Sequence, residues 1–350
     1  MKFGPVQVSK AVGAISAHSV LQGAERIKKG QVLTAKNVQH LQQAGVETVI
    51  VAELEPNDVH EDEAAARLGR AMTGGNVRAE DAFTGRVNLI AEQYVGVFFD
   101  REMLGQLNAV DEALTCATLA PFARVHAGQM VATVKIIPFS VEAAKLEAAL
   151  ALAGPISVSA FKPHLAGLVA TMVPGSSEKV LDKTARVLTR RLETLGSTLG
   201  DEIRCAHQTE DIAASIRELI VSGHDPVIVF GASAIVDRRD MVPSGIVEAG
   251  GTIDHFGMPV DPGNLLLLAH SDLVRIIGAP GCARSPKENG FDLVLERLLA
   301  GLKVQRQDIT AMGAGGLYKE IESRPQPRAA KRAERRDPQK RVAAIILAAG

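Results

Sequence analysis

The sequence predicts an α/β protein in which a three-layer αβα sandwich follows two small α/β units. Short apolar runs alternate with helical patterns after residue 155, which is typical of a parallel sheet covered on both faces. The chain has 350 residues, 46% of them hydrophobic, which suffices for more than one core. Gly154–Pro155 ends a helical pattern and marks the expected start of the sandwich.

The first half is expected to hold two units, residues 1–75 and 76–154. In the first unit Asn37 is predicted to cap a short helix that ends at Gly45. A strand and a helix with an acidic first turn are expected next, and the second unit is expected to be richer in β-structure. The predicted elements are helices over 38–44, 61–72 and 140–152 and strands over 47–52, 94–99 and 130–137.

The second half, residues 155–303, alternates strands and helices. Predicted strands cover 168–173, 226–230, 265–269 and 273–277. One predicted helix follows Ser177 and runs through Leu195, and the others cover 211–222, 243–249 and 291–302. This alternation favours helices on both sides of one sheet.

The last residues change in composition. Residues 304–341 are predicted to be an extension and a charged linker, because prolines and basic side chains gather over 324–341. A nucleic-acid-binding arm is the alternative interpretation of this run. Residues 342–350 form an apolar run that ends in Leu347-Ala-Ala-Gly350, and we expect it to be the opening strand of a further domain.

Composition narrows the classes of function. The net charge of -1 gives no overall reason to bind nucleic acid or an anionic membrane, and aromatic residues make up only 3% of the chain. Cys116, Cys205 and Cys282 lie far apart, which predicts neither a disulfide framework nor a structural zinc site. The start of the chain lacks a signal-peptide pattern and no apolar run reaches about 18 residues, so we expect a cytoplasmic protein.

Three glycine-rich loops within 230–290 are the main indication of function. They cover residues 230–240, 256–264 and 278–290, and each follows an apolar run. Glycine permits close approach of the backbone to a ligand, and N–H groups at strand-to-helix turns attract anions. Loops at the same ends of neighbouring strands would build a phosphate-accepting cleft. The expected ligand-contacting residues are Gly231, Ala232, Ser233, Asp237, Pro262, Gly263, Pro280, Gly281, Arg284 and Ser285.

Several side chains in these loops have two interpretations. Asp237 and Asp240 have the spacing to hold Mg²⁺ beside a ligand phosphate, or to form surface ion pairs with Arg238 or Arg239. Cys282 is interpreted as a small residue that fills space. The isolated histidines His207, His255 and His270 are interpreted as structural, and no catalytic residue is predicted.

The chain resembles the molybdopterin-binding proteins of molybdenum-cofactor biosynthesis over most of residues 10–305. The resemblance rests on 59–65 (VHEDEAA), 83–89 (FTGRVNL) and 135–138 (KIIP), and on the three loops. It implies a molybdopterin-binding domain, as in molybdopterin adenylyltransferases and molybdenumtransferases, with molybdopterin or molybdenum cofactor as the ligand and self-association as in related domains. The acidic residues that those enzymes carry after the first strand are replaced here by 171–177 (TMVPGSS).

Residues 347–350 resemble the opening of the nucleotide-binding motif in molybdenum cofactor cytidylyltransferases and guanylyltransferases. This resemblance implies a binding part fused to a nucleotidyltransferase, to which the cofactor is presented. The alternatives are a cofactor-sensing domain without chemistry, and an independent adenylylating or molybdate-inserting enzyme.

Overall fold

The computed structural model describes residues 1–318 except 23–24, 93–94, 99–100 and 273. The chain divides into two compact units. Unit 1 comprises Met1–Lys162 with Arg297–Leu302, and unit 2 comprises Pro163–Glu296 and continues from Lys303. The division lies shortly after the Gly154–Pro155 pair. The predicted linker at 324–341 and the predicted strand at 342–350 fall outside the described residues.

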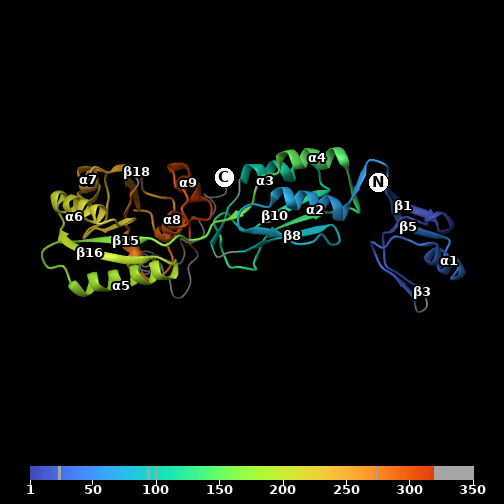
Figure 1. The fold of residues 1–350 in the computed structure, drawn as a ribbon, viewed down its shortest axis with the longest axis horizontal. Coiled ribbons are helices and arrows are strands. Elements are labelled where there is room, and N and C mark those ends of the chain that lie inside the picture. The colour runs from blue at the N-terminus through green and yellow to red at the C-terminus, as the bar shows by residue number, and fades with distance from the viewer. Residues whose placement is uncertain (23–24, 93–94, 99–100, 273, 319–350) are drawn as a thin grey trace, which may run out of the picture. The chain divides into compact units, whose positions relative to one another are not determined.

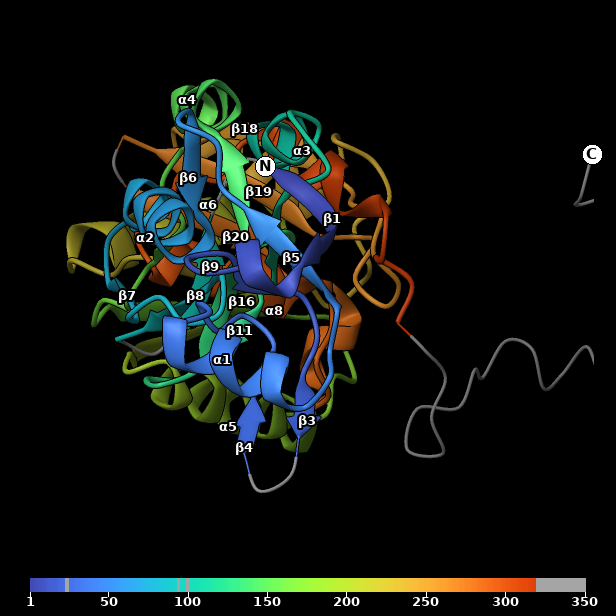
Figure 2. The same cartoon turned by 90° about the vertical axis from the view of Figure 1, so that its right-hand side faces the viewer.

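Unit 1 begins with a small antiparallel sheet of order β1-β5-β2 and a hairpin of β3 and β4 (Figure 2). Thr34 caps the following helix: its Oγ1 accepts the N–H of Asn37, and Asn37 Oδ1 accepts the N–H of Thr34 at 3.0 Å. The predicted Asn37 cap is therefore wrong, because this residue lies inside the first turn as the second half of a capping box. The elements are β1 (Lys2–Gln7), η1 (Val8–Lys10), β2 (Ile15–Ser16), β3 (Val20–Gln22), β4 (Glu25–Ile27), α1 (Ala35–Gln43) and β5 (Thr48–Glu53).

The rest of unit 1 packs around a second apolar cluster that includes Leu68, Met72, Val87 and Val134. The helix predicted over 61–72 contributes to this cluster. Residues 140–142, expected as helix, instead pair with 58–60 as a strand. The elements are β6 (Asp58–His60), α2 (Glu61–Met72), β7 (Val77–Ala79), β8 (Arg86–Ala91), β9 (Val95–Phe98), α3 (Arg101–Asn108), β10 (Leu114–Thr118), β11 (Arg124–Val125), β12 (Met130–Ile136), β13 (Ser140–Glu142), α4 (Ala143–Leu152) and β14 (Ser157–Val158).

Unit 2 contains a six-stranded sheet of order β16-β15-β17-β20-β19-β18. The first four strands in this order run parallel. β19 is antiparallel to both neighbours, so β18 runs in the direction of β20. The strands are β15 (Leu165–Met172), β16 (Thr198–Ala206), β17 (Val227–Phe230), β18 (Thr252–Phe256), β19 (Leu267–Ser271) and β20 (Val274–Gly278).

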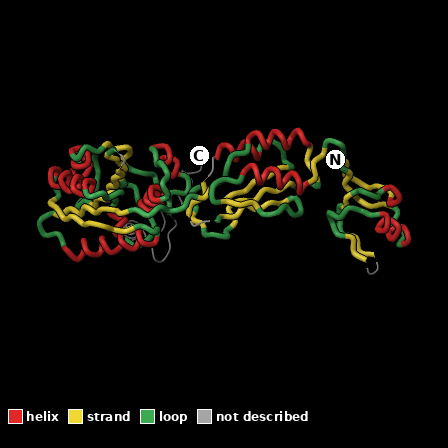
Figure 3. The backbone as a smooth tube through the Cα atoms, viewed as in Figure 1, coloured by secondary structure: helices red, strands yellow, loops and turns green. Residues whose placement is uncertain are grey.

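Helices cover both faces of this sheet, as the sequence predicts (Figures 1 and 3). α6 and α7 pack on one face, where Ile212, Ile216 and Ile246 share a buried cluster with Val169 and Val229. α5 lies on the opposite face and is joined to α8 by a hydrogen bond from Arg191 to Asp292. The helices are α5 (Glu178–Thr194), α6 (Thr209–Val221), α7 (Met241–Glu248), η2 (Gly281–Arg284), α8 (Gly290–Leu299), α9 (Arg306–Thr310) and η3 (Ala311–Gly313).

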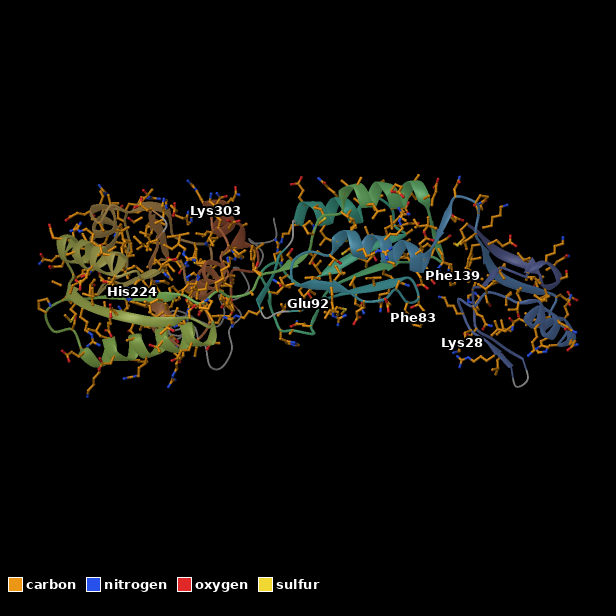
Figure 4. The ribbon with its side chains drawn as sticks, viewed as in Figure 1. Lys28, Phe83, Glu92, Phe139, His224 and Lys303 are labelled. Atoms are coloured by element: carbon orange, nitrogen blue, oxygen red, sulfur yellow. The ribbon has the colours of Figure 1, made fainter. Side chains whose placement is uncertain are left out.

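The edge strand β16 was not predicted from sequence. A buried histidine, His224, holds it in place: its Nε2 accepts the backbone N–H of Asp201 at 3.0 Å (Figure 4). Nδ1 of His224 therefore carries the ring proton and donates to Leu219 O at 3.1 Å. None of the helices in the described part of the chain has the length and apolar character needed to cross a bilayer.

Candidate anion-binding site

The predicted loops leave the sheet of unit 2 at one edge. β17, β18 and β20 run in the same direction, so the segments that follow their carboxyl ends lie on the same side of the sheet. β15 leads into α5 on one face, whereas its neighbour β17 leads into α7 on the other. Such a divergence between adjacent parallel strands is where open α/β sheets bind ligands.

Three side chains at this edge form a hydrogen-bonded chain. Thr171 ends β15, and its Oγ1 lies 2.8 Å from Nδ1 of His207, which follows β16. Nε2 of His207 lies 2.9 Å from Oγ of Ser233, in the loop after β17. Thr171 Oγ1 also accepts the backbone N–H of Ala232 at 2.7 Å. Ser233 and Ala232 are among the predicted ligand-contacting residues, whereas Thr171 and His207 are not.

The loop after β17 presents unused hydrogen-bond donors. Among the described residues, the N–H groups of Ser233 and Ala234 have no acceptor, and both residues are exposed. The loop is tight at Gly231, where a Cβ atom would lie 2.8 Å from the carbonyl oxygen of Ser233. Exposed N–H groups beside a hydroxyl can bind a phosphate or another anion.

Two sets of hydrogen bonds join the three predicted loops. The Arg284 guanidinium donates to Gly231 O at 2.8 Å and to Thr184 Oγ1 at 2.9 Å, and it stacks 5.1 Å from the centroid of Phe230. The N–H of Gly290 donates to Pro262 O at 2.9 Å. These hydrogen bonds connect the loops that follow β17, β18 and β20.

Arg191 on α5, which is not among the predicted site residues, holds the loop between β20 and α8. Its guanidinium donates to Asp292 Oδ1 at 2.7 Å and to the carbonyl oxygens of Ala283, Ser285 and Lys287 at 2.7, 2.6 and 3.2 Å. Ser285 thus contributes its carbonyl to this network. The Arg191 and Asp292 side chains are 10% and 9% exposed, so the pair is shielded from solvent.

The carboxylates predicted as metal ligands have protein partners. Asp240 caps α7: its Oδ1 accepts the N–H of Met241 at 2.8 Å and its Oδ2 the N–H of Val236 at 3.3 Å. Asp237 accepts from Nε of Arg239 at 2.8 Å, and this hydrogen bond lowers the pKa of the Asp237 carboxyl. Within the described residues, no group of three or more His, Cys, Asp or Glu side chains is placed to hold a metal ion.

Cys282 lies beside the loop network with its Sγ 3.6 Å from Oδ1 of Asn289. Burial raises the pKa of this thiol to about 11, so it is protonated at neutral pH. This agrees with a space-filling residue. His270 pairs with Asp254 at 2.9 Å, away from the chain of hydrogen bonds through His207.

A pocket of about 610 Å³ lies elsewhere, in unit 1. Its lining includes Asp58, Asp111 and Lys145. Asp58 pairs with the amino group of Met1 at 2.7 Å, and Asp111 pairs with Lys145 at 2.6 Å. These carboxylates already pair with the cations of the pocket. An anionic ligand in the pocket would therefore be repelled by the carboxylates at close range. The sheet edge of unit 2, where donors are unused, is therefore the better candidate for an anion site.

Arg284→Ala is expected to lower the free energy of unfolding of unit 2 by about 2–3 kcal/mol, because two hydrogen bonds and the stacking on Phe230 are lost. Burial lowers the pKa of this guanidinium, and the side chain acts here chiefly as a brace between loops. Urea unfolding monitored by circular dichroism measures the change. Lys287→Ala is the control, since this exposed cation in the same loop should change stability by less than about 0.5 kcal/mol. Equal stability of the two variants would contradict the bracing role.

The comparisons with known proteins give a family match for part of the chain and similar solved structures of low TM-score. The family described as Domain of unknown function (DUF8806) matches residues 5–53. The sequence matches no curated protein. Similar solved structures include the molybdopterin biosynthesis MoeA protein of Pyrococcus horikosii, at 13% identity and a TM-score of 0.30 over 86% of this chain and 75% of that chain. Another is a molybdenum cofactor biosynthesis protein of Pyrococcus furiosus, at 11% identity and a TM-score of 0.23 over 87% of this chain and 66% of that chain.

Proposed function

We propose that the carboxyl edge of the unit 2 sheet binds molybdopterin or the molybdenum cofactor through its terminal phosphate. The observation that carries the proposal is the exposed loop after β17, where Ser233 Oγ lies beside two unused N–H groups at a strand switch point. The resemblance of the three loops to molybdopterin-binding domains selects the ligand class from among phosphorylated molecules.

The loop residues have separate roles in this proposal. Ser233 Oγ and the N–H groups of Ser233 and Ala234 contact the phosphate, and the backbone at Gly231 and Ala232 holds this loop in its tight turn. Pro262–Gly263 and Pro280–Gly281 form the opposite wall, where a Cβ atom added at Gly281 would meet no atom within 4 Å. Ser285 and Arg284 support this wall through their hydrogen bonds.

A Mg²⁺ ion is a further part of the proposal. The exposed Asp237 carboxylate would give up its hydrogen bond with Arg239 and bind the ion instead. The Asp240 carboxylate would bind the ion with the oxygen lone pairs that are not used by its two N–H donors. The ion would screen the ligand phosphate. Self-association of the chain, as in related domains, also belongs to the proposal.

The chain then presents the bound cofactor to a nucleotidyltransferase domain in cis. In that reaction the cofactor phosphate attacks the α-phosphate of CTP or GTP and pyrophosphate leaves, which depends on positioning and charge stabilisation. The residues that perform this transfer belong to the second domain, so the chain alone should bind without transferring a nucleotide.

Ser233→Ala is expected to weaken molybdopterin binding about tenfold, since one hydrogen bond to a charged phosphate is lost. Fluorescence titration of anaerobic molybdopterin into the purified protein measures the affinity, with and without Mg²⁺. Ser271→Ala is the matched control, because Ser271 ends β19 at the opposite edge of the sheet. Absence of binding by the unmodified chain, or equal affinities of the two variants, would contradict the proposal.

Incubation with molybdopterin, ATP, CTP, GTP, Mg²⁺ and molybdate separates the remaining alternatives. Binding without any product agrees with presentation in cis. Adenylylated molybdopterin or inserted molybdenum would instead make the chain an enzyme in its own right. Nucleotidyl transfer by the chain alone would show that the division of roles is wrong.

A further inference from the structure

Thr171, His207 and Ser233 come from the ends of three strands, and protonation of His207 fixes the direction of their hydrogen bonds. Thr171 Oγ1 accepts the N–H of Ala232 and keeps both a second lone pair and its hydroxyl proton, so each tautomer of the neutral ring fits the two contacts. The protonated ring donates from Nδ1 to Thr171 Oγ1 at 2.8 Å and from Nε2 to Ser233 Oγ at 2.9 Å. Ser233 then accepts this bond, so its own proton is directed outward.

We propose that His207 is a positioning residue that orients Ser233 as a hydrogen-bond donor to a doubly charged phosphate or sulfate group, and that the protonated ring strengthens the binding of that group. The inference rests on the proposed anion site and adds the residue that sets its pH dependence. Thr171 holds the ring in place, since it bonds both Nδ1 and the loop backbone at Ala232.

Protonation combines two effects at the serine. A protonated imidazole donates from both nitrogens, so Nε2 donates to Ser233 Oγ and the ring carries a positive charge. An anion bound to the Ser233 hydroxyl is separated from the charged ring only by that hydroxyl, which contacts Nε2 of His207. Attraction between opposite charges at such range changes affinity about tenfold or more.

Other charged groups surround this edge on the elements packed against it. Histidine is the side chain that ordinarily changes charge between pH 5 and 8, whereas carboxylates and guanidinium groups keep theirs. His255 at the end of β18 is the other histidine on this side of the sheet, and its pKa is lowered by burial and by Arg306. The charged residues on the neighbouring loops and helix starts are Glu178, Lys179, Glu210, Asp211, Asp237, Arg238, Arg239, Asp240, Asp261, Arg284, Lys287, Glu288 and Asp292.

Sulfate is the probe for the test, because its charge is constant between pH 5.5 and 8 and the pH dependence then belongs to the protein. Binding to the full chain is followed by NMR through the backbone amides of Ser233 and Ala234, which report this edge alone. The unmodified protein is expected to bind sulfate about tenfold more tightly at pH 5.5 than at pH 8.

Three variants identify the group responsible. His207→Gln keeps an N–H donor but not the titrating charge, so its affinity should no longer depend on pH. Ser233→Ala should bind more weakly at both pH values. His255→Gln is the control and should retain the tenfold dependence.

The outcomes separate this inference from the proposed function. If the amides of Ser233 and Ala234 respond to neither sulfate nor inorganic phosphate, the anion site itself is absent and both proposals fail. If sulfate binds but His207→Gln keeps the full pH dependence, the anion site stands and the role of His207 is overturned.

Discussion

Arg191→Ala is expected to lower the free energy of unfolding of unit 2 by about 3–5 kcal/mol. The substitution removes a guanidinium that donates to four acceptors. It also leaves the Asp292 carboxylate without its cation in a shielded place, since both side chains are at most 10% exposed. The carbonyl oxygens of Ala283 and Ser285 also lose their donor. Removal of one member of a shielded ion pair costs far more than removal of a surface pair.

The measurement is hydrogen exchange of the β17 amides, which reports the free energy of opening of this sheet. Arg190→Ala is the matched control on the same helix, because Arg190 is exposed and should cost less than about 0.5 kcal/mol. Similar exchange in both variants would show that the Arg191 network contributes little to stability. A loss confined to residues 281–290 would instead show that the network orders the loop without stabilising the sheet.

Gly263→Ala is expected to destabilise unit 2 by about 2–4 kcal/mol, through backbone strain and a clash that cannot relax. Gly263 has a φ angle of +142°, and a Cβ atom there would lie 2.7 Å from both N and Cα of Gly290. Both clashing atoms belong to the backbone at the start of α8, so relief requires separation of two loops that meet at the site.

Gly281→Ala is the control for this substitution, since a Cβ atom at Gly281 meets nothing within 4 Å. Its unfolding free energy should remain within about 0.5 kcal/mol of the unmodified protein. Urea unfolding of the two variants measures the difference. An equal, small effect at both positions would mean that the loops after β18 and β20 separate easily.

The layered arrangement of unit 2 could be predicted because its inner strands are continuous apolar runs. Residues 227–230 are buried on both faces, and the sequence pattern shows this directly. The expected parallel sheet is wrong at β19, which is antiparallel to both neighbours; β18 nevertheless runs with β17 and β20, so the three loops share one edge. By contrast, β16 carries Asp201, Glu202 and Arg204, which interrupt any apolar period, because an edge strand keeps contact with water.

His207 was not predicted as a site residue because β16, the strand before it, was not predicted. Without β16 the sequence gives no reason to place His207 at the end of a strand, and its partners Thr171 and Ser233 are 36 and 26 residues away along the chain. A histidine directly after a recognised strand of the same sheet would have been a candidate site residue. The acceptors of Arg284 and Arg191 could not be predicted either, since both side chains reach loops distant in sequence.

The three strand ends that carry Thr171, His207 and Ser233 have a consequence for detecting ligands. The three residues are 36 and 26 positions apart along the chain and come together only when β15 pairs with β16 and β17, so the site forms only in the folded sheet. A ligand that binds this edge therefore binds the native state and not the unfolded chain. At a hundred times its dissociation constant such a ligand adds about 2.7 kcal/mol to the free energy of unfolding. The melting temperature thus becomes a concentration-dependent reporter of occupancy, and a library of phosphorylated compounds can be screened by heating alone.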